Sequence, residues 1–137
     1  MITEDYVSFE IAKLLKEKGF YGECMSMYVI PKPHTGMGNP NEAKIAPHGR
    51  DSYYYDGYLY QCEAPTLQMA IKWLREVHHC VICITPLIFY CGEIASKWGY
   101  CIWADDNTEV DEESSPRLES YEEACEAAIK YCLEKLI

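Results

Sequence analysis

Three stretches of the chain place apolar residues at the spacing of an amphipathic helix. The first begins after Ser8, a favourable N-cap residue, and ends at Gly19, a favourable residue just beyond a helix C-terminus. The second begins after Thr66, and the third begins after Ser120, with Glu123 at the position that completes a capping box. The pattern therefore predicts three helices, one near each end of the chain and one in the middle.

Shorter apolar runs between these helices predict strands. They cover residues 25–30, 53–55, 58–62, 80–85 with an extension at 88–90, and 99–104. The pair Asp56-Gly57 between the second and third runs is a strong hairpin signal. Short turns between strands favour antiparallel pairing, so the sequence predicts an α+β fold. We expect an antiparallel sheet of about four to five strands with three helices packed mainly on one face.

The length of 137 residues suits a single domain over residues 1–137. Two segments are without a regular pattern, a long irregular loop at 31–51 and an acidic loop at 105–119. The first is rich in proline, glycine and asparagine. Loops of this length are uncommon in compact domains unless they are functional or disordered.

The formal net charge of −10 comes mostly from one stretch. Residues 104–123 contain nine acidic side chains and one basic side chain, Arg117. An acidic balance of this kind argues against a protein that binds nucleic-acid backbones directly. The stretch is interpreted as a solvated acidic loop, and docking of a basic partner, including mimicry of nucleic acid, is the alternative.

The chain shows neither a membrane-spanning run nor the start of a secretory signal, so we expect a cytoplasmic protein. Its eight cysteines are interpreted as structural thiols in a reducing compartment. Cys125 and Cys132 lie seven residues apart on one apolar helical face. Cys24 and Cys91 are the least certain to be buried, but neither has a neighbouring base in the sequence, so catalysis is not favoured.

The best candidate for a ligand site is the 31–51 loop with the tyrosines that follow it. Cations are concentrated there in an otherwise acidic chain, and glycines permit close approach of a ligand to the backbone. The predicted ligand-binding residues are Lys32, His34, His48, Arg50, Tyr53, Tyr54 and Tyr55, with Lys44 in the same loop. These cations and rings suit an anionic, nucleotide-like molecule, although no phosphate-binding fingerprint is present. Tyr58 and Tyr60 continue the run and suit either a half-buried hairpin or a binding surface.

Metal sites are not predicted. Cys80 and Cys83 form a CxxC pair after His78 and His79, but on a strand the two thiols would point to opposite faces. The acidic residues from Asp105 onward fail as a calcium loop, since Val110 replaces the required glycine and Pro116 the required glutamate. No metal and no cofactor are therefore expected.

Three helical stretches resemble small uncharacterised proteins of prophages and mobile elements in anaerobic gut bacteria. They are YVSFEIAKLLKEKGF at residues 6–20, PTLQMAIKWLREVH at 65–78 and SYEEACEAAIKYCL at 120–133. The resemblance covers roughly a third of the chain and implies a cytoplasmic accessory protein without an assigned activity.

We therefore expect a non-enzymatic binding or adaptor module with a protein partner. The alternative is a binder or enzyme that takes a small anionic ligand through the 31–51 loop. An apolar second face of the sheet would favour a homodimer.

Overall fold

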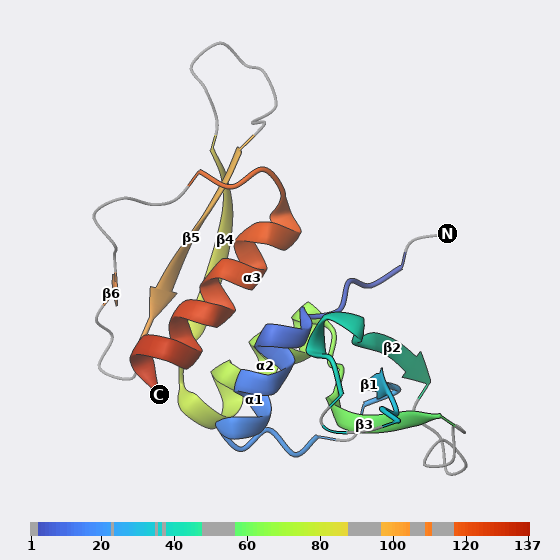
Figure 1. The fold of residues 1–137 in the computed structure, drawn as a ribbon. Coiled ribbons are helices and arrows are strands. Elements are labelled where there is room, and N and C mark those ends of the chain that lie inside the picture. Colours follow the sequence, from blue (N-terminus) through green and yellow to red (C-terminus); the bar gives the residue numbers. More distant parts are fainter. Residues whose placement is uncertain are drawn as a thin grey trace. The chain divides into compact units, whose positions relative to one another are not determined.

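The three helices form where the apolar spacing predicts them in the computed structural model of the chain (Figure 1). Helix α1 covers Phe9–Glu17, α2 covers Leu67–His78 and α3 covers Tyr121–Tyr131, continued by a π-helical turn at Cys132–Leu136. None of the described helices is both long and apolar enough to span a membrane.

The structure describes residues 3–22, 24–34, 36, 38–47, 57–87, 97–104, 109–110 and 117–137. The chain divides into two compact units. One unit comprises residues 6–66, and the other, here called the 67–137 unit, also includes residues 1–5. Each is described by itself. The single domain expected from the chain length stays a prediction.

The 6–66 unit is built on a three-stranded antiparallel sheet in the order β2-β1-β3. Strand β1 covers Ser26–Pro31, β2 covers Lys44–Pro47 and β3 covers Tyr58–Glu63. A short 3-10 helix, η1, lies at Pro40–Glu42, between β1 and β2. The register of β1 against β3 shifts between Tyr28 and Val29, where the ladder is irregular.

Successive residues of β1, from Ser26 to Ile30, are all buried. Because successive side chains of a strand point to opposite sides of the sheet, both faces of β1 are buried. Tyr28 lies against the start of α1, where its ring packs on Phe9 and its hydroxyl donates to the Val7 carbonyl. On the other face, Met27 and Val29 form a cluster with a residue of β2, Ala46. Strand β1 is therefore the core of this unit.

The 67–137 unit contains a second antiparallel sheet in the order β4-β5-β6. Strand β4 covers Val81–Leu87, β5 covers Lys97–Trp103 and β6 covers Glu109–Val110. Helix α3 packs against β4 and β5, and α2 contacts α3 and β4. Helix α3 thus covers one face of the β4–β5 pair (Figure 1).

Alternation along β5 separates its two faces. Ile102 is fully buried, and the Trp98 ring packs edge-on against Tyr121 of α3. The neighbouring position Trp103 is 40% exposed, and the residue opposite it, Val81, is 39% exposed. The face turned away from α3 is therefore partly open to solvent.

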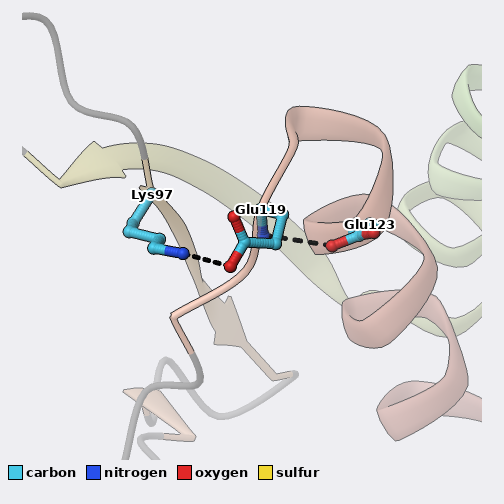
Figure 2. Close-up of polar contacts among 3 residues, drawn as sticks. All are labelled: Lys97, Glu119 and Glu123. Carbon is cyan, nitrogen blue, oxygen red and sulfur yellow. Dashed lines mark hydrogen bonds and ion pairs between the residues drawn. The ribbon is translucent and has the colours of Figure 1, made fainter.

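Polar contacts fix the start of α3 (Figure 2). The Ser120 hydroxyl accepts from the Glu123 backbone N–H, as the capping box predicts. The Glu123 carboxylate accepts from the backbone N–H of Glu119, one residue before the cap. Lys97 of β5 forms an ion pair with the Glu119 carboxylate. The capping residues thereby join α3 to the sheet beside it.

The predicted α+β class with antiparallel strands is confirmed, but the expectation of one sheet is wrong. The strands form two sheets, because β1 and β5 each take both of their neighbours from within their own unit. The 31–51 segment is also more regular than expected. It contains η1 and β2, since pairing with β1 buries Ala46.

The acidic segment 105–119 is likewise not wholly a loop. Glu109 and Val110 pair with β5, and Leu118 forms an isolated bridge with Trp98. The predicted strands at 53–55 and 88–90 lie outside the described residues.

Candidate ligand-binding surface

Two of the seven predicted ligand-binding residues, Lys32 and His34, lie in the described part of the chain, and both are exposed. The Lys32 backbone N–H donates to the Gly57 carbonyl over 2.6 Å. This bond places the start of the 31–51 segment beside the start of β3. The remaining predicted residues lie outside the described residues: His48, Arg50, Tyr53, Tyr54 and Tyr55.

A second cation of that segment, Lys44, contacts Tyr58. The Lys44 ammonium lies 4.0 Å from the centroid of the Tyr58 ring and donates to its hydroxyl over 2.9 Å. Lys44 pairs with Val29 and Tyr58 with Pro31, so the contact passes across the central strand from β2 to β3. The half-buried Tyr58 ring also packs on the Met27–Val29–Ala46 cluster.

Tyr60 is also contacted by a lysine side chain. The ammonium of Lys16, in the last turn of α1, lies 5.5 Å from the centroid of the Tyr60 ring and donates to the Gln61 carbonyl over 2.8 Å. The Tyr60 hydroxyl donates to the Glu63 carboxylate over 3.1 Å. Tyr60 is 42% exposed, so ligands can reach it.

We call these two lysines and two tyrosines the Lys–Tyr surface. Its members are Lys16, Lys44, Tyr58 and Tyr60. The two tyrosines are two residues apart in a regular part of β3, so they share a face and lie ~6.6–6.8 Å apart along the strand. Each ammonium carries three donor hydrogens, and the one hydrogen bond that it donates among the described residues leaves donors for an anion. The surface therefore offers positive charge and aromatic area side by side.

Sequence reasoning placed Lys44 in the candidate loop and left Tyr58 and Tyr60 between a half-buried hairpin and a binding surface, and it did not single out Lys16 or Glu63. Lys16 lies in α1, where a lysine in the last turn has an ordinary explanation in the helix dipole. Its approach to Tyr60 depends on how α1 packs on β3. No spacing in the sequence signals that contact.

The cysteines beside this surface are protonated at neutral pH. Cys24, one of the two cysteines whose burial was least certain from the sequence, is buried, and its backbone N–H donates to the Glu63 carboxylate over 3.0 Å. Burial, followed by the charge of Glu63, raises the pKa of the Cys24 thiol to about 11. Burial also raises the pKa of Cys62 to about 11, against the opposing charge of Lys16. A nucleophilic role for Cys24 is therefore not supported, and Cys91 lies outside the described residues.

The His–Cys run does not gather metal ligands in the part of the chain that the structure describes. No group of three or more histidine, cysteine, aspartate or glutamate side chains is placed to share an ion there. Cys80 is buried just before β4, whereas Cys83 lies within β4 opposite Cys101.

A scan of protein-family models, a search of curated proteins and a search of solved structures each returned no match. A function for the chain has to be inferred from the contacts of its described residues.

Proposed function

We propose that the chain is a small, non-enzymatic binding module whose Lys–Tyr surface docks an acidic, extended segment of a partner protein. The observation that carries this proposal is the pairing of two lysines, from α1 and β2, with two tyrosines on one strand. The ammonium of Lys44 lies 4.0 Å from the Tyr58 ring, and that of Lys16 lies 5.5 Å from the Tyr60 ring.

The spacing suits an extended peptide. Alternate side chains of such a peptide are ~6.6–6.8 Å apart on one face, the same repeat that separates Tyr58 and Tyr60. Two alternate carboxylates of the partner would meet Lys44 and Lys16, while their methylene stems would lie on the rings. Tyrosine is enriched in protein interfaces, and complementary charge across an interface steers association and fixes register.

The charge of the unit is compatible with an acidic partner. The 6–66 unit contains six lysine and arginine residues and seven aspartate and glutamate residues, for a formal net charge of −1. The 67–137 unit, with residues 1–5 included, carries −9. An acidic segment would therefore be repelled less by the 6–66 unit.

The wider biological role is proposed from the resemblance of the helical stretches. It is that of a cytoplasmic accessory protein of a prophage or mobile element, acting as an adaptor and able to form a homodimer.

The binding proposal is tested with a fluorescein-labelled peptide of alternating glutamate and serine, followed by fluorescence anisotropy. A matched peptide of alternating glutamine and serine controls for charge. We expect Lys16→Gln and Lys44→Gln each to weaken binding of the glutamate peptide by about 2–5-fold, the range for exposed ionic contacts. Lys72→Gln, an exposed lysine of α2, serves as the control and should leave binding unchanged.

The Glu63→Gln variant should have the opposite effect to the lysine variants. It removes a negative charge beside Tyr60 and retains a hydrogen-bonding side chain. This variant should bind the glutamate peptide more tightly than the wild type. Equal affinity of the wild type and both lysine variants would contradict the proposal. Lysine-dependent binding of ADP, without binding of the peptide, would replace it with a site for a small anionic ligand.

A further inference from the structure

The 67–137 unit brings cysteines together in two places. Cys83 of β4 and Cys101 of β5 are directly opposed in the antiparallel ladder. Cys80, just before β4, lies near enough to Cys132, at the end of α3, to raise the pKa of the Cys132 thiol. All four are thiols in this structure. The two pairs differ in their access to solvent.

The backbone beneath Cys83 and Cys101 already has the separation that a disulfide needs. Directly opposed residues of an antiparallel pair have Cα atoms about 4.5 or 5.5 Å apart, depending on the hydrogen-bonding position. Disulfides join Cα atoms that are about 4.4–6.8 Å apart. Either position in the ladder falls within this Cα range. The Cβ atoms of opposed residues are about 4.5–5.5 Å apart and those of a disulfide about 3.5–4.5 Å, so the bond requires side-chain rotation and a small approach of the two strands.

Cys83 and Cys101 lie on the face of the sheet that is turned away from α3. Their neighbours two positions along on that face are Val81 and Trp103, which are 39% and 40% exposed. Both cysteines are half-buried, whereas Cys80 and Cys132 are 3% and 0% exposed. A small molecule in solution can therefore approach the first pair but not the second.

We propose that Cys83 and Cys101 form a redox-active thiol pair, which a small disulfide of the glutathione type oxidises to a cross-strand disulfide. The thiolate of one cysteine attacks a sulfur of oxidised glutathione, and the glutathione S–S bond breaks to release one glutathione, which takes up a proton. The second cysteine, as a thiolate, attacks the resulting mixed disulfide and releases the other glutathione. Two protein thiols are oxidised, and one small disulfide is reduced to two thiols.

The Cys80–Cys132 pair is an internal control for this chemistry. Its two side chains lie near each other, so proximity alone would make it a competing candidate. Burial, however, raises the pKa of Cys132 strongly and excludes the oxidant. Because the thiolate is the attacking species, this pair should stay reduced while the exposed pair reacts.

The test treats the full chain with oxidised glutathione, blocks the remaining thiols with iodoacetamide and maps tryptic peptides without reduction. Cleavage after Arg75, Lys97 and Arg117 leaves Cys101 alone in one peptide and Cys83 in another with Cys80 and Cys91. We expect these two peptides to be linked, with fragmentation placing the bond at Cys83. Cys80 and Cys132 should be alkylated after unfolding.

Two variants sharpen the result. In Cys83→Ser the linked peptide should be absent, and Cys101 should retain glutathione as a mixed disulfide. Cys101→Ser should give the reciprocal adduct on Cys83. Linkage of Cys101 to Cys80 or Cys91, oxidation of Cys80 with Cys132, or stable glutathione adducts on the wild type would overturn the proposal. Failure of the peptide-binding test would not affect it, because the Lys–Tyr surface belongs to the other unit.

Discussion

The central strand of the 6–66 unit is buried on both faces, whereas most residues of the central strand of the 67–137 unit are half-buried. Ser26 to Ile30 of β1 are at most 8% exposed. In β5, Ile102 is fully buried against the α3 side, but the next residue, Trp103, is 40% exposed. The two sheets have similar strand pairing and differ in what remains accessible. The first offers side chains from its flanking strands, and the second offers part of a sheet face.

The difference determines which chemistry each unit can present. Cys24 and Cys62 of the 6–66 unit are buried, and burial raises the pKa of both to about 11, so the surface that we propose for binding in that unit consists of lysine and tyrosine. The 67–137 unit has a half-exposed thiol pair on its open face. The presence of a cysteine does not by itself show whether its thiol is buried or accessible. Its position relative to the covered face of a sheet decides this.

Alanine substitutions on opposite faces should give the largest effects and test this comparison directly. Ile102→Ala and Ile30→Ala should each lower the free energy of unfolding by about 2–5 kcal/mol, because both remove fully packed side chains. Val29→Ala should cost about 2 kcal/mol, but Val81→Ala less than about 1 kcal/mol, since Val81 is half exposed. Urea denaturation followed by circular dichroism measures each value. Equal costs for the two valines would show that the β4–β5 face is covered.

The buried thiol of Cys62 makes the stability of the chain depend on alkaline pH. Its ordinary pKa of 9.0 applies to the unfolded chain, whereas the folded chain holds the proton up to about 11. The unfolded state therefore loses this proton first as the pH rises, and the stabilising contribution, fully present below 9, is lost between 9 and 11. The loss should approach about 3 kcal/mol, since a pKa difference of one corresponds to about 1.4 kcal/mol. Urea denaturation of the wild type and Cys62→Ala across this range isolates it, because other titrating groups are common to both. Parallel curves would contradict the assignment.

The ends of α1 and α2 each contain a residue with a positive φ, a glycine in one and a histidine in the other. Gly19 has a φ of 94°, and Phe20 donates to the Leu15 carbonyl in a Schellman motif. At the end of α2, His79 has a φ of 56° without being glycine. Gly19→Ala should destabilise the chain by about 1–2 kcal/mol, and His79→Gly should stabilise it by up to about 1 kcal/mol. Thermal denaturation of both variants should shift in opposite directions. A shift in the same direction would show that His79 makes a compensating contact.

The sequence predicts helices well because the information that specifies them is local. Ser8, Gly19 and Ser120 act at the positions expected from capping rules, and the apolar spacing locates all three helices. Strand pairing depends on distant residues. Lys44–Pro47 becomes β2 because it pairs with β1, and nothing within those four residues specifies that partner.

The candidate site was predictable to the extent that it is local in the chain. The cations of the 31–51 segment and the tyrosines after it pointed to the region where Lys44 contacts Tyr58. Lys16 could not be found, since α1 reaches Tyr60 only through the packing of the helix on β3. The thiol pair was missed for the same reason, because the opposition of Cys83 and Cys101 follows from the strand register.

The smallest expected effects distinguish the N-termini of α1 and α3. Ser8 and Ser120 each accept a hydrogen bond from the backbone N–H three residues later, so each change to alanine should cost about 1 kcal/mol. In α3 the residue at that third position is Glu123, whose carboxylate also holds Glu119 (Figure 2). In α1 the residue at that position is Ile11, whose side chain cannot accept a hydrogen bond. Ser120→Ala should therefore be non-additive with Glu123→Ala, whereas Ser8→Ala should be additive with Glu123→Ala. Urea denaturation of the single and double variants gives the coupling, and additivity for both serines would show that the capping box contributes nothing beyond Ser120.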